Sequence, residues 1–323
     1  MSEKLLDVKN LHTSFFTHLG EVQAIRDVSF GLDKGEIIGI VGDSGSGKSV
    51  TSLSIMGLLA YPGRVKKGEI LFNGEDLLKK KKSEMRKIQG DHIAMIFQDP
   101  MTALNPTMTV GDQINEVVLQ HNKISREEAE KRTIEMLEMV GISSLRFHDY
   151  PHQFSGGMKQ RVVIAMALAC NPELLLADEP TTALDVTIQA QVLEMIKALK
   201  DKFNTSMVLI THDLGVVAET CDKVAIIYAG EIVESGSKEQ IFRNPVHPYT
   251  LGLFGSLPKL DDDSKRLKPI KGLPPDPTHL PQGCKFCPRC PESCEAGKEC
   301  AASMIEIEKG HFVRCHKFGK GGV

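Results

Sequence analysis

The chain has 323 residues, of which 41% are hydrophobic and 25% are charged, and its formal net charge is −3. These values are typical of a soluble globular protein of one large or two ordinary domains, and they exclude a fibre and a largely disordered chain. The slightly acidic balance gives no support to a surface that coats nucleic acid, and we expect no nucleic-acid partner.

The N-terminal segment predicts strands that lead into a glycine-rich loop. From residue 5 to residue 40, short alternating segments separated by Gly and Asp indicate antiparallel strands. An aromatic side chain here could stack on a nucleotide base, and Phe15 and Phe16 are the candidates. A half-buried core position explains either ring equally well.

The loop GDSGSGKS fits the phosphate-binding pattern G-x-x-x-x-G-K-[ST] at every fixed position. An apolar, β-branched run at 37–41 precedes it, and a segment with helical spacing follows at 49–59, which is the setting the motif requires. Glycines let backbone N–H groups point at phosphate oxygens. Lys48 is expected to reach the β- and γ-phosphates, and the Ser49 hydroxyl to bind Mg²⁺. The expected nucleotide contacts are Gly42, Ser44, Gly45, Ser46, Gly47, Lys48 and Ser49.

The middle of the chain combines a buried strand with a helical insertion. The run at 92–97 is a predicted core strand, and the polar Gln98 at its end is well placed to face the phosphate loop. Helical spacing then dominates, with one helix predicted at 126–140, and the insertion is expected to span about 107–165. Near its end, Ser155, Gly156 and Gly157 open a helix predicted at 158–169. This start offers a Ser cap and free backbone N–H groups to an anion.

Two further strands end in candidate catalytic residues. The apolar run 174–177 is followed by Asp178 and Glu179, as expected where a strand of a phosphate site holds Mg²⁺ and activates water. An amphipathic helix is predicted at 187–203, and the strand at 206–211 ends at His212. Such alternation of strands and helices predicts a mostly parallel sheet.

In this order, these motifs closely resemble an ABC transporter ATPase subunit over about residues 5–257. The signature LSGGQ of that family reads FSGGM here, which keeps its Ser-Gly-Gly core. The resemblance implies an α/β P-loop NTPase core with an N-terminal antiparallel β-subdomain and an inserted helical subdomain, in an ATPase domain at 1–257. The residue roles that it implies are Phe15 as the adenine-stacking aromatic with Phe16 in reserve, Ser49, Gln98 and Asp178 for Mg²⁺, Glu179 as general base, Asp185 in the D-loop, and His212 as the switch histidine.

The segment NPVHPYT at 244–250 narrows the resemblance to the ATPases of dipeptide and oligopeptide permeases. That family implies ATP-driven peptide import by a head-to-tail pair of ATPase subunits, identical or paralogous, below two membrane permease subunits and fed by an extracellular peptide-binding protein. Each ATP is then held between one subunit's phosphate loop and its partner's Ser155–Gly157 helix. A soluble ABC-type ATPase acting in Fe–S assembly, or in another non-transport role, is the alternative, but it lacks the His-Pro-Tyr segment.

The sequence shows no run near the roughly 18 apolar residues of a spanning helix and no apolar core of a signal peptide at its start. The resemblance implies a peripheral protein on the cytoplasmic face of the cell membrane.

Six of the eight cysteines lie in the last forty residues. A Pro-rich linker is predicted at 258–283, and it is expected to separate a Cys-rich, metal-binding tail at 284–323 from the phosphate loop. Four thiolates suit either a [4Fe–4S] cluster or structural Zn²⁺, and we favour [4Fe–4S] because the paired C-x₂₋₄-C units of Zn sites are absent from the favoured set. That set, implied by the resemblance of this tail to the permease ATPases, is Cys284, Cys290, Cys300 and Cys315. The set with ferredoxin-like spacing is Cys284, Cys287, Cys290 and Cys294.

Overall fold

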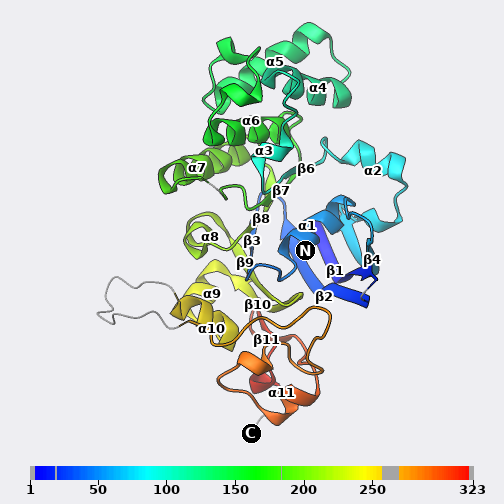
Figure 1. The fold of residues 1–323 in the computed structure, drawn as a ribbon, viewed down its shortest axis with the longest axis vertical. Helices are drawn as coiled ribbons and strands as arrows, with labels where there is room; N and C mark the ends of the chain where they lie inside the picture. The colour runs from blue at the N-terminus through cyan, green and yellow to red at the C-terminus, as the bar shows by residue number, and fades with distance from the viewer. Residues whose placement is uncertain (1–3, 19, 183, 257–268, 320–323) are drawn as a thin grey trace. The chain divides into compact units, whose positions relative to one another are not determined.

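The computed structural model describes residues 4–18, 20–182, 184–256 and 269–319, and they form two compact units (Figure 1). The first unit comprises Met1–Leu6, Gly31–Ile37 and Leu71–Thr211. The second comprises Asp7–Phe30, Ile38–Ile70 and His212–Val323. The phosphate loop and the Cys-rich tail therefore belong to the same unit.

The first unit is built on three parallel strands. Strand β7 (Leu174–Asp178) pairs with β6 (Ile93–Ile96) on one side and with β8 (Ser206–Thr211) on the other. Every residue of the three strands is buried. Parallel strands that are covered on both faces need apolar residues at successive positions, which explains the continuous apolar runs in the sequence.

Several helices of this unit begin at a side-chain hydroxyl cap. Thr109 caps α4 (Val110–His121), Ser125 caps α5 (Arg126–Met139), and Ser155 caps α6 (Gly156–Leu168). Each hydroxyl accepts a backbone N–H that the helix leaves unpaired. The remaining elements are β5 (Glu75–Asp76), α2 (Lys82–Ile88), α3 (Pro100–Ala103), α7 (Val186–Phe203), and the 3₁₀ turns η1 (Leu77–Lys79), η2 (Ser144–Arg146) and η3 (Pro151–Gln153).

The second unit contains the phosphate-loop strand and a sheet that the tail extends. Strand β3 (Ile37–Val41) pairs in parallel with β9 (Lys223–Tyr228), and β9 pairs antiparallel with β10 (Glu231–Ser237). The tail strand β12 (His311–Val313) pairs with β10, and β11 (Ile305–Glu308) pairs with β12. The other elements that lie wholly or mostly in this unit are β1 (Lys4–Thr17), β2 (Gly20–Asp33), α1 (Lys48–Met56), β4 (Gly63–Phe72), α8 (Leu214–Thr220), α9 (Lys238–Arg243), α10 (Pro248–Gly255), α11 (Glu295–Glu299), and the 3₁₀ turns η4 (Cys287–Arg289) and η5 (His316–Phe318).

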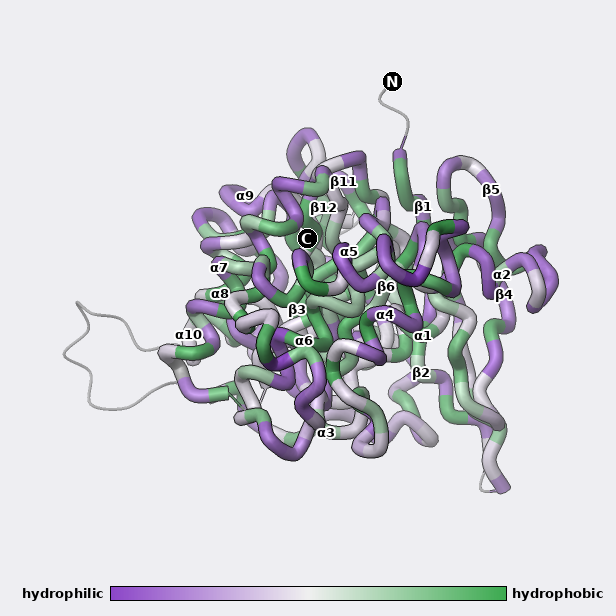
Figure 2. The backbone as a smooth tube through the Cα atoms, turned by 90° about the horizontal axis from the view of Figure 1, so that it is seen from above, coloured by the Kyte–Doolittle hydropathy of each residue, from purple (hydrophilic) through white to green (hydrophobic). Residues whose placement is uncertain are grey.

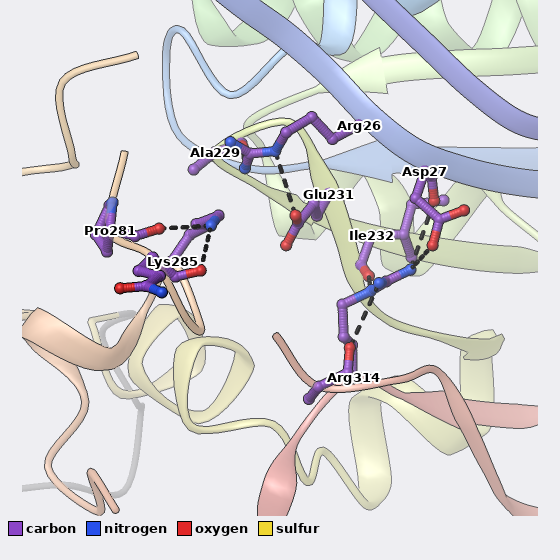
Figure 3. A network of polar contacts seen from close by, with 10 residues as sticks. Arg26, Asp27, Ala229, Glu231, Ile232, Pro281, Lys285 and Arg314 are labelled. Carbon is purple, nitrogen blue, oxygen red and sulfur yellow. Dashed lines mark hydrogen bonds and ion pairs between the residues drawn. The ribbon is translucent and has the colours of Figure 1, made fainter. Parts of the chain in front are cut away.

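Charged side chains also join the tail to the rest of this unit. Arg314 Nη2 donates to Asp27 Oδ2 at 2.8 Å, and Arg314 Nε donates to the Ile232 carbonyl at 3.2 Å (Figure 3). Deeper in the unit, Glu234 and His311 are both fully buried and pair at 2.9 Å. The expectation that the linker separates the tail from the phosphate-loop unit is therefore wrong, because the tail supplies strands to its sheet and a partner to its buried carboxylate.

Hydropathy follows these positions along the chain. In Figure 2 the β3 segment is coloured hydrophobic, whereas α2, which buries none of its residues, is largely hydrophilic. No helix within the described residues is long and apolar enough to cross a membrane.

Candidate functional site

The phosphate loop runs from the end of β3 to the start of α1 in the second unit. Gly45 and Gly47 have φ values of 75° and 102°, which residues with a side chain rarely adopt. A Cβ atom on Gly42 would lie 2.1 Å from the Ile227 carbonyl oxygen, so the motif's first glycine is required by close packing. The glycines thus let the backbone curl tightly enough to turn its N–H groups toward an anion.

The Lys48 side chain contacts the backbone at the start of this loop. Its Nζ donates to the carbonyl oxygens of Gly42 at 2.7 Å and Asp43 at 2.9 Å, and the residue is 5% exposed. Ser46 is also buried, and its Oγ has no hydrogen-bond partner among the described residues. A cradle of glycine backbone, a buried ammonium and an unpaired hydroxyl fits the phosphates of a nucleotide.

The two candidate aromatics lie at the N-terminal strands of the same unit, and both are half-buried. Phe15 packs so closely on Gly63 that a Cβ there would lie 2.7 Å from its ring. The Arg64 guanidinium lies 4.0 Å from the centroid of the Phe16 ring. These contacts leave the choice of Phe15 for adenine stacking a prediction.

A polar cluster stands at the carboxyl end of β7 in the first unit. Glu179 Oε2 accepts a hydrogen bond from Gln98 Nε2 at 3.1 Å and another from Thr182 Oγ1 at 2.9 Å. Glu179 has a φ of 46°, a costly conformation for a residue with a side chain. Asp178 beside it is 4% exposed. Gln98 and Glu179 are thus in contact, whereas the contact with Thr182 was not predicted from the sequence.

Two helix starts in the first unit remain open to solvent. Ser155 is exposed, its Oγ accepts from the Met158 N–H at 3.4 Å, and Gly156 has open space around it. Asp185 is exposed and caps α7 through the Ile188 N–H at 2.9 Å. In the second unit, His212 is exposed directly after β8.

A cavity of about 640 Å³ opens inside the Cys-rich tail. No set of three or more His, Cys, Asp or Glu residues in the described ranges is arranged to hold a metal ion. Cys300 does not line the cavity. Its Sγ lies 4.0 Å from Nε2 of His316, which is one of the lining residues. The cavity is lined by five of the six tail cysteines, namely Cys284, Cys287, Cys290, Cys294 and Cys315.

Burial acts on these thiols. It raises the pKa of Cys290 to about 11, and it also raises the pKa values of Cys284, Cys287 and Cys315. Binding of a metal would therefore have to displace protons from these sulfurs.

The His-Pro-Tyr segment starts helix α10. His247 is 1% exposed, and its Nδ1 accepts the Tyr249 N–H at 3.0 Å. Burial lowers the pKa of His247 to about 4. The imidazole is therefore neutral at physiological pH and serves as a helix cap.

Replacing His247 by Asn should reduce the pH dependence of stability. Because the folded pKa of about 4 lies below the ordinary 6.5, the unfolded chain binds the proton more readily. The stability from neutral His247 is therefore full above pH 6.5 and is lost as the pH falls towards 4, by at most about 3 kcal/mol. Asn keeps a cap acceptor.

The measurement is the thermal midpoint of both proteins at pH 7 and pH 5. The midpoint of His247→Asn should fall less than that of the wild type, and equal falls would contradict the assignment of the lowered pKa.

Two family models match the chain. The model described as ABC transporter covers residues 25–182, and the model described as oligopeptide/dipeptide transporter, C-terminal region, covers residues 233–300. The chain is 58% identical to the dipeptide transport ATP-binding protein DppD of Bacillus subtilis, over 97% of this chain and 94% of that protein. The chain belongs to the ATP-binding subunits of dipeptide and oligopeptide ABC transporters.

More distant relatives agree with this membership. The oligopeptide transport ATP-binding protein OppD of Escherichia coli is 48% identical, over 98% of this chain and 94% of that protein. Among solved structures, a dimeric post-hydrolysis state of the ATP-binding cassette MJ0796 bound to ADP and Pi is similar, with a TM-score of 0.66 and 29% identity. The structural match covers 72% of this chain and 98% of the MJ0796 chain. The α/β P-loop fold of an ABC ATPase, expected from the motifs, is thereby confirmed.

Proposed function

We propose that this chain is the ATP-hydrolysing subunit that powers import of di- or oligopeptides through a membrane ABC permease. The observation that carries the proposal is the 58% sequence identity to a dipeptide transport ATP-binding protein along 97% of the chain. An intact phosphate loop and the hydrogen-bonded pair of Gln98 and Glu179 support it. The chain acts as a peripheral subunit on the cytoplasmic face of the membrane.

The residues divide the work of hydrolysis. Lys48 and the loop backbone bind the β- and γ-phosphates, Glu179 orients the attacking water and accepts its proton, and His212 donates a hydrogen bond to the γ-phosphate. Ser49, Gln98 and Asp178 would hold Mg²⁺, which supplies charge neutralisation on the transferred phosphoryl group. Asp178 fits this role because it is a buried carboxylate at the end of a strand.

The open helix starts suit a partner subunit. Ser155, Gly156 and Gly157 expose backbone N–H groups that would contact ATP bound by a second ATPase, a copy of this chain or a paralogue, in a head-to-tail dimer. Asp185 lies at the start of the next helix and would contribute to the same face. ATP would then close the dimer, and hydrolysis would open it.

The partners can be tested by affinity purification from detergent-solubilised membranes. We expect the tagged chain to retain two membrane permease subunits and an ATPase partner, identified by mass spectrometry. A chain found only with soluble assembly proteins would instead favour an ATPase that acts in Fe–S assembly.

Substitution of His212 by Ala is expected to lower turnover more than nucleotide affinity. The loss in kcat should be roughly 10²-fold, the typical effect of removing one hydrogen-bond donor to developing charge. Steady-state ATPase kinetics and ATP titration measure the two quantities. Equal losses in both would indicate a structural histidine.

We further propose that the tail holds a [4Fe–4S] cluster, with Zn²⁺ as the alternative. The thiol-lined cavity supports this proposal, because soft thiolates select Fe–S clusters and Zn²⁺. The ligand set that the family resemblance implies is Cys284, Cys290, Cys300 and Cys315. The ferredoxin-like alternative is Cys284, Cys287, Cys290 and Cys294.

A further inference from the structure

The phosphate loop carries an acidic side chain beside the place where it binds an anion. Asp43 follows the first glycine of the loop, and its side chain is 31% exposed. A carboxylate here repels the phosphates of ATP, because like charges at short range oppose each other. Tight ATP binding therefore requires this charge to be compensated.

The C-terminal part of the same unit supplies a compensating cation. Arg289 Nη1 lies 3.5 Å from Asp43 Oδ2 and donates to Tyr228 Oη at 3.3 Å. The Arg289 side chain is only 8% exposed, and its Nε donates to the Lys271 carbonyl at 3.2 Å. The guanidinium is thus held in a fixed position by the loop, by a core tyrosine and by the Pro-rich segment.

The backbone of Asp43 is held from the same side. Its N–H donates to Tyr249 Oη at 3.0 Å, and Tyr249 is fully buried. The ring of Phe286 packs against Tyr228 and Tyr249, with centroids 5.2 and 5.4 Å apart. Phe286 precedes the short turn at Cys287–Arg289 and Arg289 ends it, so one segment of the Cys-rich tail supplies both the ring that packs on the tyrosines and the cation that faces Asp43.

We propose that Arg289 and Tyr249 are positioning residues for the phosphate loop, so that the tail sets the affinity of the chain for ATP. Arg289 neutralises the Asp43 carboxylate, and Tyr249 fixes the direction of the Asp43 peptide. The inference rests on the proposed binding of ATP at this loop. It predicts changes in ATP affinity and KM with little change in kcat, since neither residue belongs to the reacting groups.

The test measures the dissociation constant of a fluorescent ATP analogue for the full-length protein. Arg289→Gln should weaken binding about 10-fold, because it exposes one negative charge to the phosphates. Arg289→Lys should retain most of the affinity. The double variant Arg289→Gln/Asp43→Asn should return to within about 2-fold of the wild type. Since Asp43 lies outside the tail, such recovery cannot come from repair of the tail.

Tyr249→Phe is the second variant. It should also weaken binding about 10-fold, because the half-buried Asp43 N–H loses its acceptor, and adding Asp43→Asn should not restore the affinity. Arg314→Gln is the matched control, because Arg314 also joins the tail to the rest of the unit, but through Asp27 instead of Asp43 (Figure 3). Its affinity should stay within about 2-fold of the wild type.

Three results would overturn the inference: unchanged affinity in Arg289→Gln, no recovery in the double variant, or an equal loss in Arg314→Gln. A wild-type chain that binds no ATP would instead contradict the proposed function, so the two failures are distinguishable.

Discussion

Glu179→Gln is expected to slow ATP hydrolysis by roughly 10²–10⁴ while ATP binding stays intact, because the variant loses the proposed general base and keeps the shape of the side chain. Glu179 accepts hydrogen bonds from Gln98 and Thr182. The amide can keep these contacts through its oxygen, so the local structure should survive. The expected product is an ATP-bound dimer, detected by size-exclusion chromatography with ATP and Mg²⁺.

A matched control lies at the other end of the same strand. Glu173 immediately precedes β7 and pairs with His92 at 3.0 Å. Glu173→Gln changes the charge by the same amount, but the turnover of this variant should stay within about 2-fold of the wild type. Glu179→Gln hydrolysing ATP at the parental rate would rule out its assignment as the base.

The second large effect concerns the metal that we propose for the tail. Protein purified without oxygen should be brown and contain about four Fe with little Zn. Serine at Cys284, Cys290 or Cys315 should abolish iron binding, because a cluster ligand is lost. Serine at Cys300 should do the same if the set implied by the family resemblance is correct, whereas serine at Cys287 or Cys294 should leave iron in place.

The cavity makes this comparison decisive. Cys287 and Cys294 line it and Cys300 does not. Iron loss on replacing Cys287 and Cys294, but not Cys300, would establish the ferredoxin-like set, and zinc in place of iron would overturn the cofactor assignment. Because Arg289 and Phe286 link the tail to the phosphate loop, loss of the metal should also weaken ATP binding, contrary to the independence that the linker suggested.

Local sequence patterns predicted the core elements well. The continuous apolar run before Asp178 predicts a strand covered on both faces, and β7 is such a strand. The glycines and Lys48 predict the phosphate loop, because steric limits on the backbone leave few other residues possible there. Helix α6 begins at Gly156, two residues before the predicted start, since the Ser155 cap already fixes the first turn.

Contacts between distant segments were not predictable in this way. Nothing near Glu234 in the sequence announces a buried carboxylate, because its partners are His311 and two backbone N–H groups at 246 and 247. Asp43 occupies a position where the loop motif accepts any residue, and Arg289 lies 246 residues further along the chain. The Pro-rich composition between them predicted separation, whereas tertiary packing brings the tail onto the loop.

Peptide import by the reconstituted transporter tests the proposed function most directly. Proteoliposomes would contain the two permease subunits, this chain and its ATPase partner, and they would receive the peptide-binding protein and a labelled mixture of di- and oligopeptides. We expect peptide accumulation that requires ATP, that persists with Glu173→Gln, and that disappears with Glu179→Gln. An assembly that hydrolyses ATP at the wild-type rate but accumulates no peptide would contradict the proposed function.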